Sequence, residues 1–283
     1  MIELNGKKIR LVVISDFGRN TAGILGLVYG TKYIDAVIAT CKSPMHSARL
    51  AKSMLRDLHY PKVPVYVGSS PRSSGTFKAQ ATYSSLAKVE SVGRFSSPLK
   101  EILDDGFPTI IVVNSPMTDL RNFLRDDYNP NQHKIGRIVM QGAAERGGYF
   151  TLPDRNSVNN ISDITAAFEA FTLVQRFKIP FTIVTEALAD KLSISLGHYS
   201  DLGTHKILNY LEQMRVASLG FSKSQGTLTS DVSNILTIMV AVIPQDFYYR
   251  RIGSQTSLCY EVSRKEGVRY QANILRTLQK NLG

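Results

Sequence analysis

Short apolar runs rich in β-branched residues recur along this chain and alternate with segments of helical spacing. Within these runs the hydrophobicity is continuous rather than alternating, which is typical of strands covered on both faces. Such strands form a largely parallel sheet flanked by helices, and the βαβα order favours an α/β fold. The runs that predict strands are Ile9 to Ile14, Ala36 to Thr40, Val63 to Val67, Thr109 to Val113, Arg137 to Met140, Phe181 to Val184 and Thr237 to Ile243.

Helical spacing predicts helices in the intervening segments, which are His46 to Leu58, Thr118 to Leu124, Ile164 to Arg176 and His198 to Arg215. Ser162-Asp163 and Thr118-Asp119 are predicted N-caps, because their side chains can accept hydrogen bonds from a first helical turn. Without an internal repeat or a linker, we expect a single domain over residues 1–283. The Ser-rich segment at about 69–98 lacks a long apolar run and predicts a long surface loop, either a lid or a mere insertion.

Composition narrows the class of protein further. The chain has 34 Lys and Arg against 23 Asp and Glu, a formal net charge of +11 that can attract nucleic acid, nucleotides or an acidic protein. A solvated basic surface without a dedicated partner explains the charge equally well.

Cys41 and Cys259 give no disulfide framework and no metal-ligand spacing, so both are interpreted as reduced structural thiols. With no membrane-length segment and no signal-peptide core, we expect a cytoplasmic protein without a membrane partner.

The first apolar run ends at Asp16, before a Gly-containing turn and the start of a helical pattern. Open α/β sheets place ligand-handling groups at the carboxyl end of a first strand. The segment Asp16-Phe-Gly-Arg-Asn-Thr21 resembles the opening motif of the nucleoside hydrolases, which reads Asp, Pro, Gly, any residue, Asp, Asp. The first acid is present, while Asn20 and Thr21 replace the two later acids.

The resemblance continues along most of the chain, and the common order of the segments carries it. It implies a nucleoside-hydrolase-like, open and mainly parallel sheet flanked by helices. The further matching segments are Pro64-Val-Tyr-Val-Gly68, Ile110 to Asp119, Ile138 to Gly142, Gly148 to Asp163, and Ser230-Asp231 before an apolar helix.

The resemblance also implies a calcium ion that holds the attacking water and the ribose hydroxyls. Asp16 and Asp231 match two carboxylate ligands, and Asn114 matches a ligand that acts through its backbone carbonyl. Thr21 occupies the place of the third carboxylate. Because calcium prefers about six to eight oxygen ligands, several of them charged, we expect weak or absent calcium binding.

The residues that the resemblance places around the ribose are altered too. Asn20 replaces an acid that grips a ribose hydroxyl, Ser157 stands at the Glu position of the family, and Asn159 matches its Asn. Ser230 stands where many members carry a His that protonates the leaving base, and the pKa of a serine hydroxyl is far too high for that role. Asp16 remains as a candidate general base. Read without the resemblance, Asp16 and Asp231 are simply helix caps.

Three hypotheses follow. The altered site favours a protein with lost or strongly reduced N-ribosyl hydrolase activity, which acts through binding or assembly with a nucleoside, a nucleotide, a protein or a second copy. The alternative is an active, divergent nucleoside hydrolase that uses Asp16 as general base. A nucleic-acid-associated structural protein is the third hypothesis, and its support is the net charge. The fold does not decide between them, because function depends on the site.

Overall fold

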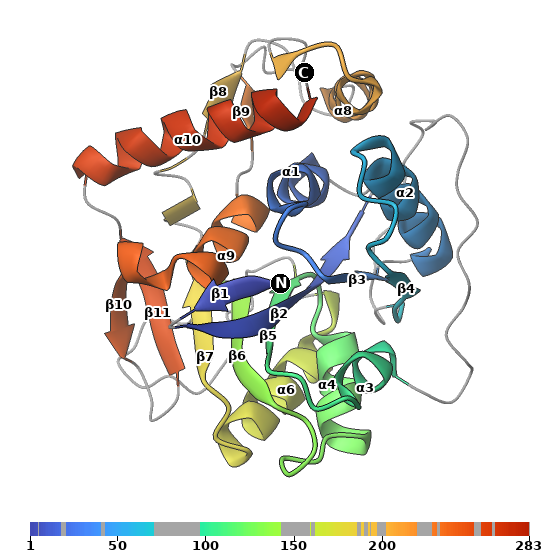
Figure 1. Ribbon diagram of the computed structural model, residues 1–283, viewed down its shortest axis with the longest axis vertical. Helices are drawn as coiled ribbons and strands as arrows, with labels where there is room; N and C mark the ends of the chain where they lie inside the picture. Colours follow the sequence, from blue (N-terminus) through green and yellow to red (C-terminus); the bar gives the residue numbers. More distant parts are fainter. Residues whose placement is uncertain are drawn as a thin grey trace.

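A central sheet between two layers of helices organises the computed structural model (Figure 1). The Ser-rich segment expected as a loop lies almost wholly outside the described residues, as do Cys41 and His198. The structure describes residues 1–4, 6–17, 21–40, 43–70, 97–142, 159, 162–185, 188–189, 192, 194–196, 202–219, 228–230, 233–251, 256–261 and 264–282.

Within the described residues the main sheet has nine strands, in the order β10-β11-β7-β6-β5-β2-β3-β4, with β1 paired to β2. All neighbours from β11 to β4 are parallel, whereas β1 and β10 pair antiparallel with β2 and β11. The predicted mainly parallel α/β fold is therefore confirmed. The strands are β1 Ile2–Leu4, β2 Lys7–Asp16, β3 Ala36–Thr40, β4 Val65–Val67, β5 Thr109–Asn114, β6 Ile135–Gln141, β7 Phe181–Val184, β10 Tyr248–Arg251 and β11 Thr256–Glu261, with β8 Ile194–Leu196 and β9 Leu228–Ser230 in a separate pair.

Two hydrophobic clusters cover the two faces of the sheet, because successive strand residues point to opposite sides. On β2, Leu11 and Val13 pack into one cluster and Val12 and Ile14 into the other. The first cluster includes side chains of α1 Thr21–Gly30, α2 Pro44–Asp57, α8 Lys206–Leu219, α9 Ser233–Val242 and α10 Arg264–Leu282. The second includes side chains of α3 Pro98–Leu103, α4 Thr118–Asp126 and α6 Ile164–Arg176.

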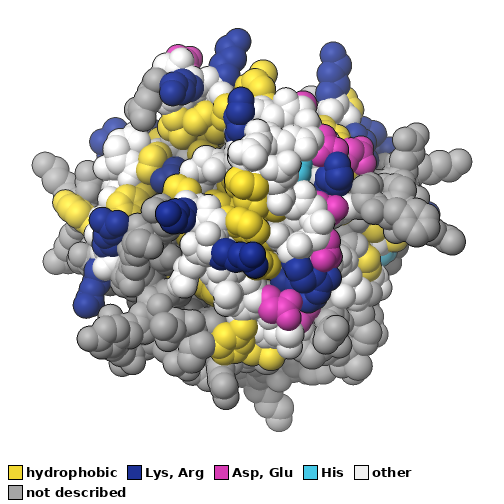
Figure 2. Space-filling view, turned by 90° about the horizontal axis from the view of Figure 1, so that it is seen from below, with side chains coloured by type: hydrophobic (Ala, Val, Ile, Leu, Met, Phe, Trp, Pro, Cys, Tyr) yellow, Lys and Arg dark blue, Asp and Glu magenta, His cyan; other side chains and the backbone are white. Residues whose placement is uncertain are grey.

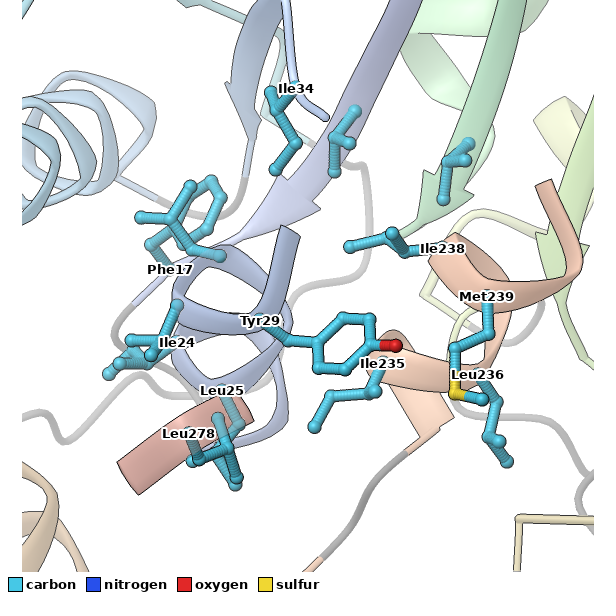
Figure 3. Packing of buried hydrophobic residues seen from close by; sticks show 14 of the residues in the cluster. Phe17, Ile24, Leu25, Tyr29, Ile34, Ile235, Leu236, Ile238, Met239 and Leu278 are labelled. Atoms are coloured by element: carbon cyan, nitrogen blue, oxygen red, sulfur yellow. The ribbon is translucent and has the colours of Figure 1, made fainter. Parts of the chain in front are cut away.

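Helix α1 lies at the centre of the first cluster and is buried on every side from Ala22 to Gly30. It packs against α9 and α10, and Figure 3 shows side chains of all three helices meeting there. The approach of α1 to α9 depends on Gly26, where an added Cβ would lie 2.9 Å from the Cβ of Asn234. Such a separation is closer than carbon atoms tolerate, so a glycine permits this contact.

One predicted strand is wrong. The segment Thr237 to Ile243 belongs mainly to helix α9, which is followed by the short 3-10 helix η2 Pro244–Asp246. Every residue of α9 from Ser233 to Ala241 is buried, so its sequence lacks the polar face that would reveal a helical period. A short apolar run of this kind does not distinguish a buried strand from a buried helix.

None of the helices that the structure describes combines the length and the apolar character needed to cross a membrane.

Candidate functional site

The strand order reverses between β2 and β5. From β2 the chain adds β3 and β4 on one side, and then returns to add β5, β6 and β7 on the other. In open parallel sheets, ligands bind beyond the carboxyl ends of the strands at such a switch point. Asp16 is the last residue of β2 and Asn114 the last residue of β5, so both lie at this position.

The ladder registers bring these two residues close together. Ser15 pairs with Asn114 across β2 and β5, and Asp16 pairs with Thr40 across β2 and β3. Asp16 and Asn114 are each 3% exposed, so the chain holds a carboxylate and an amide in a nearly water-free edge of the sheet. Helix α1 approaches Asp16 closely, and an added Cβ at Gly23 would lie 2.5 Å from the Asp16 carbonyl oxygen.

Helix α9 contributes polar side chains to the same edge. The hydroxyl of Thr237 donates to the Oδ1 of Asn114 at 2.7 Å, and the Nδ2 of Asn234 lies 3.4 Å from the Oγ of Ser15. All four side chains are buried. Buried polar groups without partners would destabilise the fold, and these hydrogen bonds supply the partners. They also fix the first turns of α9 against the ends of β2 and β5.

A second buried carboxylate lies near the ends of β3 and β4. Asp119 is 3% exposed and accepts the backbone N–H of Ser69 at 2.8 Å and 3.1 Å through its two oxygens. Burial raises the pKa of the Asp119 carboxyl, although the hydrogen bonds from Ser69 oppose that shift. Gly68 makes room for it, because a Cβ there would lie 2.7 Å from Oδ2 of Asp119. The carboxyl therefore holds the chain where it leaves β4.

The two predicted N-caps have different outcomes. Asp163 caps α6 as expected, with its Oδ1 accepting the backbone N–H of Ala166 at 3.1 Å. The N-cap of α4 is Met117 and has no side-chain cap, so the prediction for Thr118-Asp119 is wrong. Tertiary partners take these side chains instead, since the Thr118 hydroxyl donates to Oδ2 of Asp163 at 2.7 Å and Asp119 binds Ser69.

The remaining predicted site residues are only partly described. Thr21 begins α1 and is half-buried, and Asn159 is half-buried in the segment before α6. Asn20, Ser157 and Asp231 lie outside the described residues. Among the residues that are described, no three His, Cys, Asp or Glu side chains gather into a group suited to a metal ion.

Sequence reasoning did not identify Ser15, Asn234, Thr237 or the tertiary role of Asp119 at this edge. Asn234 and Thr237 carried a usable signal, since two polar residues three positions apart in an apolar segment share one face of a helix. Reading Thr237 to Ile243 as a strand concealed that spacing. Asp119 gave no such signal, because its partner Ser69 is 50 residues away in the chain.

Comparison with solved structures identifies similar proteins of the same architecture. The structure of the effector protein XOO4466 has a TM-score of 0.79 and 17% identity, covering 98% of this chain and 95% of that one. The type III effector XopQ, solved with adenosine diphosphate ribose, gives 0.76 and 17%, covering 98% and 96%. A plant nucleoside hydrolase, PpNRh1, gives 0.68 and 15%, covering 97% and 99%.

Sequence comparisons give no further assignment. No family model matches the chain, and no curated protein matches it either. The likeness to the three solved structures is a likeness of fold, which the chain shares over nearly its whole length.

Proposed function

We propose that this chain binds a ribose-containing nucleoside or nucleotide at the carboxyl edge of its sheet and has lost most or all N-ribosyl hydrolase activity. The position of Asp16 and Asn114 at the switch point supports the binding site. A structure with the same fold was solved with adenosine diphosphate ribose, which supports a ligand of this class.

Ribose hydroxyls need hydrogen-bond acceptors and donors held in fixed positions. Asp16 supplies a buried carboxylate, and its attachment to the end of a central strand limits its motion. The hydrogen bond from the Thr237 hydroxyl fixes the Asn114 side chain in position before a ligand arrives. We assign Asn20, Ser157 and Asn159 to the same ribose site on the strength of the motif resemblance.

The donor set fits calcium poorly. The sequence from Asp16 to Thr21 carries the amide of Asn20 and the hydroxyl of Thr21 where the resembling motif has two carboxylates. Both groups are neutral, so two negative charges that would attract a divalent cation are missing. We therefore derive no catalytic step through a metal ion.

Loss of hydrolysis follows from the same replacements. Cleavage of an N-glycosidic bond develops positive charge on the ribose and requires an activated water and a proton for the leaving base. Asp16 can act as a base, but its neighbours Asn20 and Thr21 add no charge to orient a water beside it. Ser230, at the position of the proton donor, is a far weaker acid than His. The observation that carries the proposal is this replacement of acids beside a retained Asp16.

The experiment combines calorimetric titration of adenosine diphosphate ribose with chromatography of adenosine, inosine and uridine incubated with the protein. We expect binding without release of free base. Asp16→Asn should weaken binding about tenfold or more, because hydrogen bonds to a charged group contribute roughly 1.5–3 kcal/mol. Asp126→Asn, which removes one charge from the surface of α4, is the matched control and should bind normally.

Two outcomes contradict the proposal in different ways. Release of base by the unmodified protein, abolished in Asp16→Asn, would establish the active divergent hydrolase instead. Failure of adenosine diphosphate ribose and of all three nucleosides to bind at millimolar concentration would remove the ribose site altogether.

A further inference from the structure

A cavity lies at the edge of the sheet opposite Asp16 and Asn114, where β2, β5 and β6 begin. Its volume is about 670 Å³, within the range of roughly 300–1,000 Å³ typical of small-molecule sites. At about 3.3 Å per residue, Ile110 is ~13 Å along β5 from Asn114, and Ile9 is ~23 Å along β2 from Asp16. The cavity is therefore separate from the candidate ribose site. Its apolar walls come from Leu4, Ile9, Ile110 and Pro244.

Arg137 places a guanidinium in this apolar surrounding. It lies near the start of β6, is partly buried, and donates from one NH2 group to the Ala241 carbonyl oxygen at the end of α9 at 3.2 Å. Burial lowers the pKa of Arg137, which reflects the loss of hydration around its charge. A guanidinium carries several N–H donors in a planar fork, so binding one carbonyl leaves donors for a ligand.

The two charged residues among the described lining of the cavity are both basic. Lys7 lies at its rim with an exposed side chain, and Gln245 is neutral. No Asp or Glu occurs among the described residues that line it. On the face drawn in Figure 2, Lys and Arg side chains lie among exposed hydrophobic ones. Because the charged residues that line the cavity are Lys7 and Arg137, a ligand with a negative charge complements it.

We propose that this cavity binds a small organic monocarboxylate with an apolar body, whose carboxylate is held by Arg137 and attracted by Lys7. The guanidinium fork matches a carboxylate with two parallel hydrogen bonds. The aliphatic walls match a hydrocarbon body, whose burial contributes about 0.8 kcal/mol per CH2 group. Neither part of the ligand suffices by itself, because the site combines two basic side chains with several apolar ones.

Calorimetric titration of the full chain with octanoate, acetate, 1-octanol and inorganic phosphate tests the two parts separately. We expect octanoate to bind at one site, and both acetate and 1-octanol to bind at least about tenfold more weakly. Inorganic phosphate has the charge without the hydrocarbon body and should also bind weakly. Equal binding of octanoate and 1-octanol, or tighter binding of phosphate than of octanoate, would overturn the proposal.

Substitutions locate the site. Arg137→Gln should weaken octanoate binding about tenfold or more, and Arg137→Lys should recover part of the loss because it keeps the charge without the fork. Lys7→Gln should weaken binding about twofold, as expected for an exposed charge. Lys8→Gln is the matched control, because neighbouring strand residues point to opposite sides and Lys8 does not line the cavity.

The variants also keep the proposal distinct from the ribose site. Asp16→Asn should leave octanoate binding unchanged. If Arg137→Gln does not fold, as judged by circular dichroism, the Lys7 and Lys8 variants and the ligand series still test whether the cavity binds the carboxylate. Unaltered octanoate affinity in a folded Arg137→Gln protein, or equal effects of Lys7→Gln and Lys8→Gln, would contradict the assignment.

Discussion

The side-chain hydroxyl of Thr237 donates to the Oδ1 of Asn114 at 2.7 Å, although the two residues are 123 positions apart in the chain. Both side chains are buried, one on helix α9 and the other at the end of strand β5. This hydrogen bond joins the helix to the strand at the point where the order of the sheet reverses. Its removal therefore affects the stability of the fold and the candidate site together.

Thr237→Val keeps the shape of the side chain and leaves the Oδ1 of Asn114 without this donor. Unfolding free energy should fall by about 1–3 kcal/mol, which is typical when a buried polar group loses its partner. Urea denaturation measures the change. Thr172→Val is the control, since its exposed hydroxyl bonds the Phe168 carbonyl of its own helix, and it should alter stability by no more than about 0.5 kcal/mol. Equal effects of both changes would contradict the role assigned to Thr237.

Gly26→Ala tests the close contact of α1 with α9. The added Cβ would lie 2.9 Å from the Cβ of Asn234, so the helices must separate, and we expect a loss of about 1–3 kcal/mol. Gly136→Ala is the matched control. Its Cβ would meet nothing closer than the Thr109 carbonyl oxygen at 3.7 Å, and the change should be neutral or stabilising by up to about 1 kcal/mol. Thermal unfolding measures both changes. A loss of stability in Gly136→Ala as large as that in Gly26→Ala would contradict the close contact assigned to Gly26.

Asp119→Asn tests the buried carboxyl that holds Ser69. Because burial raises the pKa of Asp119 in the folded state, its contribution to stability is present in full below the ordinary carboxyl pKa of 3.8 and is lost as pH rises toward the folded value. The unmodified protein should thus lose stability relative to Asp119→Asn as pH increases from about 4 to 7. Urea midpoints of the two proteins over this range measure the difference. A constant difference, or one with the opposite slope, would show that the carboxyl stays ionised.

Asp104→Asn should have the opposite pH dependence. Hydrogen bonds from Lys100 and His133 lower the pKa of the Asp104 carboxyl in the folded state. Its contribution to stability is therefore present above the ordinary pKa of 3.8 and is lost as pH falls through the lower folded value. The advantage of the unmodified protein over Asp104→Asn should shrink on acidification below about pH 4. Acid unfolding curves that remain parallel for both proteins would contradict this.

The double change Asn20→Asp and Thr21→Asp tests the calcium prediction. It restores two carboxylates beside Asp16, so calcium affinity should rise, and a cation that binds the folded state should raise the melting temperature. The unmodified protein should shift little in the same thermal scan. Hydrolysis need not return, because Ser157 and Ser230 still replace an acid and a proton donor. Strong stabilisation of the unmodified protein by micromolar calcium would refute the predicted weakness of the site.

The sequence predicted most of the buried parallel strands, although β11 was missed. Ala36–Thr40, Phe181–Val184 and the helix Ile164–Arg176 were predicted to the residue, because continuous or periodic hydrophobicity marks them. Edge strand β10 was missed, since Tyr248–Arg251 is largely exposed and lacks that signal. The apolar helix α9 was mistaken for a strand for the reason that every side chain of its first nine residues is buried.

The candidate site was predictable only in part. Asp16 and Asn114 follow apolar runs, so their position at one sheet edge could be expected from the parallel order of the strands. The partners that hold them could not, because Thr237 and Asn234 reach this edge through tertiary packing across long stretches of chain. Motif resemblance and fold similarity agree on the architecture.

The packing of α10 on α1 has a consequence for synthesis of the chain. Asn281 donates to the Val28 carbonyl oxygen at 2.8 Å across 253 positions of sequence. At about 5–20 residues per second, a ribosome needs ~13–50 s to make that intervening stretch. For that time α1, apolar on every side, lacks its last covering helix. The nascent chain thus exposes apolar surface of α1, and a translational stall before α10 would favour binding by chaperones or aggregation.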